Sequence, residues 1–299
     1  MSGSTPLEAE IIREWTADPN EVFPLEQTIR LPSPIQLPNT RKDAYLTVLN
    51  MSITTEIPNI FSWTTFNNRR VRVATKDVLG NIVDAWRTIV MESGRYSVSN
   101  ISSAINTEIA SWGWYTNATQ PVLQIGSNNT TSRTWVELDD TKLAVGHGTH
   151  LIVDMSLLTA QSDLSYTLGF AEVDNPFGNT GPVLYSITEN DQAPKVDTQG
   201  THVRILCDDL APPRFVNSSI YRSLATIPIT EIPVGTITPT ISWPRTGVTP
   251  TLHYSGPRII SSYTIRSLGG RSSESRTQGF PVLVKGLGTV LQVTMHLYS

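Results

Sequence analysis

The residues of this chain that could hold a metal ion gather around one short stretch. His147 and His150 flank a Gly-Thr pair, and Asp139, Asp140 and Asp154 lie nearby in the sequence. A zinc site needs three or four ligands at defined spacings, and here a third ligand at such a spacing is missing. Two histidines in a Gly-containing loop beside a strand are more often loop and surface residues. We therefore predict no metal site.

A second acidic pair, Asp208-Asp209, follows a predicted strand. Carboxylate oxygens there could bind a cation, but a solvated turn is the simpler interpretation. Gly286-Leu-Gly288 leads into a strand, whereas a phosphate-binding loop leads into a helix. This Gly-X-Gly therefore predicts a hairpin turn.

No pattern in the sequence indicates a catalytic site. There is no Gly-X-Ser-X-Gly nucleophile motif, and the acidic residues lie mostly in predicted turns, not in a pair suited to glycoside hydrolysis. A Ser-His-Asp triad is assembled only in space, so the sequence leaves it open. The histidines fall in different predicted elements: His147, His150, His202, His253 and His296. We predict no catalytic residue, no cofactor-binding residue and no cofactor, and that the protein is not an enzyme.

Three further sets of side chains have both a structural and a functional interpretation. The single cysteine, Cys207, cannot form an intrachain disulfide, and its place in a predicted strand indicates a small buried side chain. The aromatic group Trp112, Trp114 and Tyr115 could stack on sugars or bases, but core or interface anchoring is favoured at a helix end. A mild positive bias near the C-terminus predicts a solvated face ahead of an inter-subunit or genome-facing contact; it comes from Arg258, Arg266, Arg271 and Arg276.

Composition narrows the class of protein. Of 299 residues, 39% are hydrophobic and 16% are charged, below the roughly 25% charged residues usual in soluble domains. Such a surface suits strands, and it suits faces covered by neighbours, because interface cores are depleted in charge. The net charge of -4 and the lack of a basic run argue against nucleic acid as the main partner. We expect no secretory signal and no membrane span.

Strand patterns dominate the chain, and one helix stands out. Alternating apolar residues over 70–75, 202–207 and 291–297 predict half-buried strands. Ser99 is the expected N-cap of the helix, an apolar stripe follows from Ile101 to Trp112, and Gly113 is the expected stop. One short helix is thus predicted near 100–112.

The predicted fold class is all-β, a jelly-roll β-sandwich with elaborated loops. Residues 1–38 carry prolines at short spacing and predict an extended N-terminal arm, or an edge strand where prolines are near-alternating. Residues 39–299 form the sandwich. A second sandwich from about residue 210, after the Pro-rich stretch 208–213, is the alternative.

Two regions carry a resemblance to a known family. The first combines an apolar strand with Glu92-Ser-Gly-Arg-Tyr-Ser-Val98 and the helix start Asn100-Ile-Ser-Ser-Ala-Ile-Asn106. The second runs from Val203-Arg-Ile-Leu-Cys-Asp208 through Leu224-Ala-Thr-Ile-Pro-Ile229 and Ile259 to the terminal strand. Together, over residues 40–110 and 200–299, they resemble jelly-roll capsid proteins of polinton-like viruses, virophages and adenovirus-like elements, of the penton or minor capsid type.

The resemblance implies a structural virion protein that self-assembles by packing of β-sandwiches. Its expected partners are copies of itself, as a pentamer or trimer, and neighbouring capsid proteins, and its expected location is the virion. The arm over residues 1–38 would reach to a neighbour. The alternative function is a receptor- or carbohydrate-binding spike or fibre head that uses Trp114 and Tyr115, with a glycan receptor as its partner.

Overall fold

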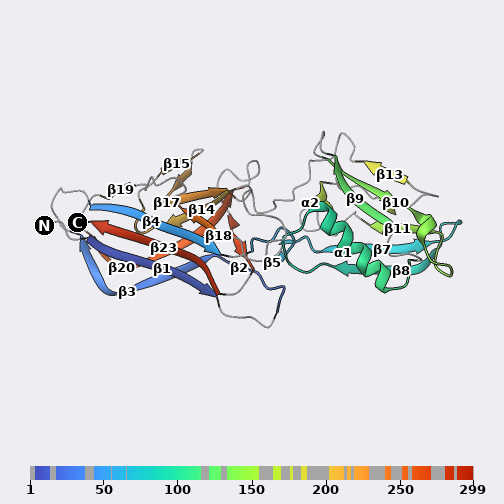
Figure 1. Cartoon of the computed structure of the whole chain (residues 1–299), viewed down its shortest axis with the longest axis horizontal. Coiled ribbons are helices and arrows are strands. Elements are labelled where there is room, and N and C mark those ends of the chain that lie inside the picture. The colour runs from blue at the N-terminus through green and yellow to red at the C-terminus, as the bar shows by residue number, and fades with distance from the viewer. Residues whose placement is uncertain are drawn as a thin grey trace. The chain divides into compact units, whose positions relative to one another are not determined.

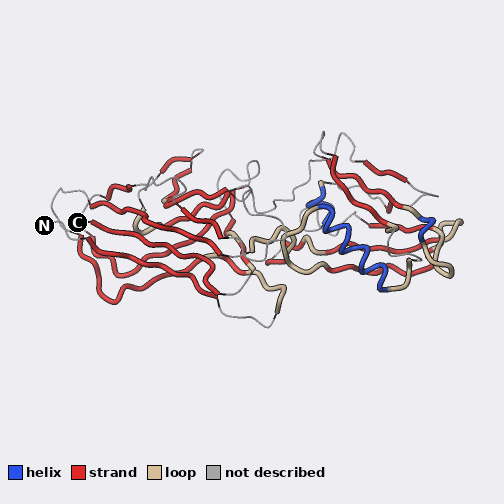
Figure 2. Tube along the Cα trace, in the orientation of Figure 1, coloured by secondary structure: helices blue, strands red, loops and turns tan. Residues whose placement is uncertain are grey.

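The chain forms two compact units. A computed structural model describes residues 4–13, 18–37, 44–54, 56–64, 66–115, 121–128, 133–154, 164–169, 176–177, 183–186, 202–211, 214–216, 219–228, 240–243, 251–254, 258–270, 280–285 and 288–298. Unit 1 comprises residues 1–58 and 199–299, and unit 2 comprises residues 59–198 (Figure 1). Strands make up most of both units (Figure 2). None of the helices in this described part is long and apolar enough to cross a membrane.

Unit 1 is a sandwich of two antiparallel sheets. The first sheet has the order β1 (Ser4–Arg13), β23 (Gly288–Tyr298), β4 (Ala44–Thr54) and β18 (Thr240–Trp243), with β19 (Thr251–Tyr254) also pairing with β4. The second has the order β17 (Ser223–Pro228), β14 (His202–Cys207), β20 (Arg258–Gly270) and β21 (Phe280–Pro281), with β3 (Glu26–Leu37) pairing with β20. Two short ladders add β2 (Phe23–Pro24) to β22 (Leu283–Val284) and β15 (Arg214–Val216) to β16 (Ser219–Tyr221).

One apolar core joins the two sheets of unit 1. Period-two alternation sends every second side chain of each strand inward. The first sheet contributes Leu7, Met51, Ile53, Leu291, Val293 and Met295, and the second contributes Val203, Ile205, Cys207, Leu224, Ile260, Tyr263 and Ile265. The alternating patterns that predicted strands over 202–207 and 291–297 are thus the two inner faces of one sandwich.

The pairing of the strands identifies unit 1 as a jelly roll. In chain order the main strands are β1, β3, β4, β14, β17, the β18–β19 pair, β20 and β23. The first pairs with the last (β1 with β23), the second with the last but one (β3 with β20), the third with the β18–β19 pair, and the fourth with the fifth. This nesting of antiparallel pairs over two sheets is the jelly-roll topology. The prediction of an all-β jelly roll is confirmed.

The N-terminal region differs from the predicted arm, because it supplies the first two strands of the jelly roll. Strand β1 pairs with β23 from Ser4 to Arg13, and Leu7 is buried. Residues 26–30 and 35–37 of β3 pair with β20, and the residues between them do not. Pro32 and Pro34 therefore lie where no ladder pair forms. Prolines are tolerated on such an edge strand, and the edge-strand interpretation of this stretch is the one that the structure follows.

The internal boundary also differs from the predicted one at about residue 210. Asp208–Ala211 is a turn within unit 1, where the Ala211 N–H donates to the Cys207 carbonyl at 2.9 Å. The strands on its two sides, β14 and β17, pair with each other. The chain divides instead at residues 59 and 198, because unit 2 is inserted between the third and fourth strands of the jelly roll.

Unit 2 has two small sheets and a helix around its own core. One sheet has the order β12 (Pro176–Phe177), β11 (His150–Asp154), β7 (Arg70–Lys76) and β8 (Ile82–Val90). The other has the order β13 (Val183–Ser186), β10 (Arg133–Leu138) and β9 (Leu123–Asn128). Helix α1 (Val98–Ser111), helix α2 (Leu164–Leu168), a 3-10 turn (Asp140–Lys142) and the hairpin β5–β6 (Ser62–Trp63, Phe66–Asn67) complete it.

Helix α1 confirms the predicted helix, but its N-cap is Ser97 and not Ser99. The Ser97 hydroxyl accepts from the backbone N–H of Asn100 at 3.1 Å, three residues on, whereas Ser99 already lies in the first turn. At the other end Gly113 has φ +78°, which favours glycine, and its N–H donates to the Ala110 carbonyl at 2.9 Å. Gly113 is thus the predicted stop.

A pair of serine variants tests this cap. Ser97→Ala removes the acceptor for an otherwise unpaired helix N–H, so we expect it to destabilise α1 by about 1 kcal/mol. Ser99→Ala, the matched control two residues on, is expected to change stability by less than about 0.5 kcal/mol. Hydrogen exchange of the α1 amides measures both. A larger effect for Ser99→Ala would place the cap where the sequence alone had put it.

Candidate functional site

The histidines and aspartates that the sequence brings close together form separate pairs in the structure. His150 Nδ1 lies 3.0 Å from Asp140 Oδ2, and His147 Nδ1 lies 3.1 Å from Asp84 Oδ1. Asp154 forms an ion pair with Arg72. Among the residues that the structure describes, no group of three or more His, Cys, Asp or Glu side chains could hold a metal ion. Each carboxylate therefore has a partner that is not a co-ligand.

The His150–Asp140 pair is buried and holds the 3-10 turn against β11. Asp140 Oδ1 also accepts from the Leu151 backbone N–H at 2.9 Å. Burial raises the pKa of Asp140, while the hydrogen bonds from Leu151 and His150 oppose that rise. The pair thus satisfies polar groups at the margin of a core.

The His147–Asp84 pair ties a loop to the start of β8. Burial raises the pKa of Asp84, but hydrogen bonds from Thr75, His147 and the Gly148 N–H outweigh it, so the pKa lies below its usual value. The Gly148 N–H also donates to Thr75 Oγ1 at 3.1 Å. Asp84 lies 63 residues from His147, so no local sequence pattern predicts this contact.

The acidic pair in unit 1 is also engaged within the protein. Asp208 Oδ2 accepts from Arg266, 2.8 Å from Nε, and Asp209 Oδ2 accepts from the Thr264 N–H at 2.9 Å. Both contacts bind the turn to β20. Arg266 therefore belongs to an ion pair, whereas Arg271 and Arg276 lie outside the described residues, as does the side chain of Arg258. Gly286 lies outside them too.

Cys207 is a buried core residue, as predicted. Its side chain has no exposed surface, and burial raises the pKa of the thiol to about 12. A thiol with this pKa carries almost no thiolate near neutral pH, so it is a poor nucleophile.

The aromatic group at the end of α1 acts mainly as a core anchor. Trp114 is fully buried and meets Trp112 edge-on, with ring centroids 5.1 Å apart. The Arg87 guanidinium lies 5.0 Å from the Trp112 ring centroid and 5.4 Å from that of Trp114. Because Trp114 has no free face, it cannot stack on a sugar, which corrects the residue assignment of the carbohydrate-binding alternative. Tyr115 is half-buried.

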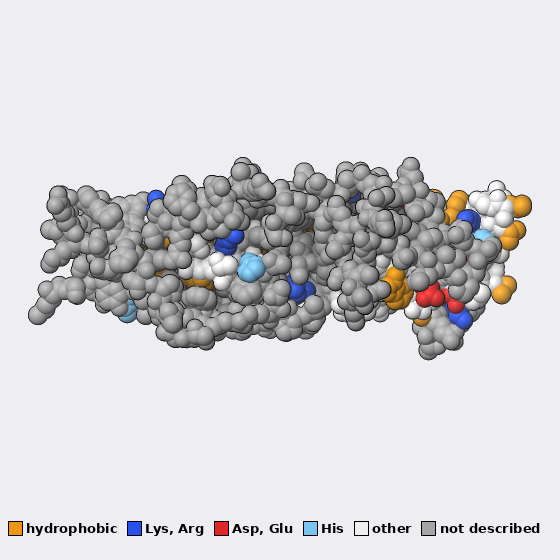
Figure 3. All heavy atoms as spheres, turned by 90° about the horizontal axis from the view of Figure 1, so that it is seen from above, with side chains coloured by type: hydrophobic (Ala, Val, Ile, Leu, Met, Phe, Trp, Pro, Cys, Tyr) orange, Lys and Arg blue, Asp and Glu red, His pale blue; other side chains and the backbone are white. Residues whose placement is uncertain are grey.

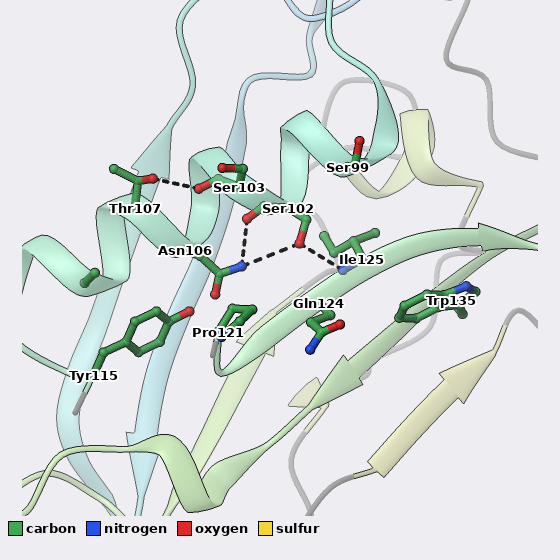
Figure 4. Close-up of a pocket in the computed structure, with 11 residues that line it drawn as sticks. Ser99, Ser102, Ser103, Asn106, Thr107, Tyr115, Pro121, Gln124, Ile125 and Trp135 are labelled. Atoms are coloured by element: carbon green, nitrogen blue, oxygen red, sulfur yellow. Dashed lines mark hydrogen bonds between the residues drawn. The ribbon is translucent and has the colours of Figure 1, made fainter. Parts of the chain in front are cut away.

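A groove of about 550 Å³ runs between α1 and strands β9 and β10 (Figure 4). Helix α1 takes the place of a neighbouring strand there: Ser102 Oγ accepts from the Ile125 N–H at 3.0 Å, and the Asn106 amide bonds to both the N–H and the carbonyl of Leu123. These contacts satisfy the edge of β9. Trp135, Gln124 and Tyr115 line the groove beside the polar face of the helix.

An exposed apolar surface, here called the apolar strip, follows β8 and the turn before it. Val78 and Leu79 are 74% and 82% exposed, and the other members are 38–55% exposed: Ile82, Val83, Trp86 and Val90. Separate exposed hydrophobic side chains, in orange, are visible at the right-hand end of Figure 3. Large exposed apolar side chains that gather along one strand mark interaction sites more often than scattered single ones do. No pattern in the sequence indicated that these side chains would be exposed.

Hydrogen bonds to Asp77 fix the turn that carries the first two residues of the apolar strip. Asp77 Oδ1 accepts from the N–H groups of Leu79 at 2.8 Å and Asn81 at 2.9 Å, closing the turn. The Asn81 side-chain hydrogen bond contributes most to a lowered pKa of Asp77. Strand β8 is last in its sheet, and its outer edge pairs with no strand in the described part of the chain. Apolar side chains and an open strand edge therefore coincide.

The fold and these surfaces define a jelly-roll protein with a second β-rich unit inserted in it. Two solved structures are similar over nearly the whole chain. The crystal structure of the mavirus penton protein matches with 11% identity and a TM-score of 0.43, covering 99% of each chain. A chain of the Sputnik virophage structure, determined by cryo-electron microscopy, matches with 12% identity and a TM-score of 0.40, covering 98% of this chain and 97% of that one. Virophages were also among the viruses whose capsid proteins the sequence resembles. No family model and no curated protein matches the chain.

Proposed function

We propose that the chain is a structural subunit of a virion shell, of the penton or minor capsid type, that self-assembles. The jelly roll of unit 1 is an architecture used by viral capsid proteins, lectins and cupins. The resemblance of residues 40–110 and 200–299 to capsid proteins favours the first of these. The observation that carries the proposal is the apolar strip, because it is a surface suited to burial between subunits.

The two charged side chains of β8 do not protect its open edge, which favours the burial of that edge between subunits. Asp84 is engaged by His147, and Arg87 lies over Trp112 and Trp114, so both charges bond within their own unit. Soluble proteins commonly protect an edge strand with outward charges or prolines. A neighbouring subunit that covers β8 would supply hydrogen bonds to the open edge and remove Ile82, Val83 and Val90 from water.

A closed ring is the assembly proposed for this contact. In a ring each subunit offers one surface to a different surface of the next copy. The apolar strip supplies one of those two surfaces, and a pentamer or trimer is the expected product, which then contacts neighbouring capsid proteins in the virion. The role is structural and needs no catalytic group or cofactor.

The test places charge on the apolar strip. We expect the wild-type chain to form rings in native mass spectrometry and electron microscopy. Ile82→Lys with Val90→Lys should weaken assembly at least tenfold, because an ammonium loses its hydration when buried. Gln36→Lys with Thr226→Lys adds the same charge at exposed strand positions of unit 1 and should leave the rings intact. A wild-type chain that stays monomeric, or a charged strip that assembles normally, would refute the proposal.

A further inference from the structure

The groove beside α1 is built without charge. Every residue that lines it is uncharged, and most carry a hydroxyl or amide group or an aromatic ring. Such groups both donate and accept hydrogen bonds. A ligand that carries phosphate or carboxylate would find no cation among the lining residues, so the groove fits a neutral molecule rich in hydroxyl or amide groups.

One wall of the groove is a row of hydroxyls on α1. Ser99, Ser103 and Thr107 follow at intervals of four residues, which places them above one another along a helix face, and all three are exposed. Thr107 Oγ1 donates to the Ser103 carbonyl at 2.9 Å, so its oxygen remains free to accept. Ser102 and Asn106, between them, point to β9 (Figure 4).

The opposite wall carries an aromatic platform. Trp135 of β10 lies over Gly126, its cross-strand partner on β9. A Cβ atom at Gly126 would come 2.2 Å from Trp135 Cζ2, so only glycine allows the ring to lie this close to the strand. Gln124 is exposed on the same face of β9, two residues before Gly126. An indole ring and a primary amide therefore stand next to each other.

Tyr115 adds a polar group at the groove. Its Oη is buried and makes no hydrogen bond of good geometry, although the backbone N–H groups of Val122 and Leu123 lie close enough to oppose the effect of burial on its pKa. Burial raises the pKa of this phenol to about 12, so it stays protonated and can donate. The two N–H groups approach the oxygen of this hydroxyl, so its hydrogen is the part that a ligand oxygen could accept.

We propose that this groove binds a neutral saccharide. The apolar C–H face of a sugar ring stacks on Trp135, while its hydroxyls bond to Gln124 and to the hydroxyls of α1. A few polar groups placed around an aromatic wall give orientation and specificity in small-molecule sites. An uncharged peptide offers fewer hydroxyls to the row on α1 and is the less suitable ligand. The inference is independent of the assembly proposed above.

The experiment uses the full-length chain with monovalent neutral oligosaccharides. A glycan array selects the ligand, and saturation-transfer NMR with the free sugar then measures its affinity, so that avidity in an oligomer does not contribute. Trp135→Ala and Gln124→Ala should each weaken binding at least tenfold. Trp63→Ala, which removes another half-buried indole of unit 2 outside the groove, should leave glycan binding unchanged.

The exposed position of Gln124 keeps the test valid if Trp135→Ala fails to fold. The proposal is overturned if no neutral glycan binds, if the sugar binds equally to Gln124→Ala, or if a matched library of uncharged peptides binds at the groove where sugars do not.

Discussion

Deletion of residues 1–13 should unfold unit 1 and leave unit 2 folded. Strand β1 pairs with β23 along its whole length, and Leu7 is buried in the core between the two sheets. The Tyr263 hydroxyl of the opposite sheet donates to the Glu8 carbonyl at 3.1 Å, so the deletion also leaves a buried hydroxyl unpaired. The core side chain and the unpaired hydroxyl alone cost about 3–8 kcal/mol, and the lost strand pairing adds to a loss already comparable to the about 5–15 kcal/mol that stabilises a typical domain.

Hydrogen exchange resolved by unit is the measurement. Amides of β23 and β20 should lose protection in the deletion variant, while those of β7 and α1 keep it because their core lies within residues 59–198. Leu7→Ala should destabilise unit 1 by about 2–5 kcal/mol, and Glu10→Ala, at an exposed position of the same strand, should have little effect. If β23 stayed protected without residues 1–13, these residues would be an arm after all.

Local alternation was enough to predict most of the strands, because a strand that faces a core must repeat every two residues. The sequence of β23 from Leu291 to Met295 shows this clearly. Alternation does not state which strands pair, and in this fold the decisive pairs are far apart: Leu7 lies opposite Met295. The insertion of unit 2 between β4 and β14 could not be predicted for the same reason.

The candidate sites depend even more on contacts across the chain. Of the four residues that are close in sequence, Asp140 and His150 bond to each other, whereas His147 bonds to Asp84 and Asp139 to Thr141. The groove had one local signal: Ser102 and Asn106 are polar residues four apart, next to the apolar stripe of α1. That pattern indicates a helix face whose polar side chains form hydrogen bonds with another part of the protein. Only the fold shows that their partners are backbone groups at the edge of β9.

Trp114→Ala should destabilise unit 2 by about 3–5 kcal/mol, the usual cost of removing a buried Trp side chain. Trp114 is fully buried in the core that also holds Ile105 and Ile109. The substitution creates a cavity and removes the Trp114 ring from beside Trp112 and Arg87, contacts that add about 0.5–1.5 kcal/mol beyond area burial.

Unfolding of the full chain, followed by hydrogen exchange of the α1 and β11 amides, measures this loss. Trp114→Phe should recover part of it, because a smaller aromatic ring fills part of the same space. Trp63→Ala, at a half-buried site outside that core, should cost clearly less. A Trp114→Ala variant with wild-type protection but weakened glycan binding would instead make Trp114 the sugar platform and transfer that role away from Trp135. Because a ring without exposed surface cannot stack on a ligand, we expect the stability loss and unchanged selectivity for glycans in the molecules that remain folded.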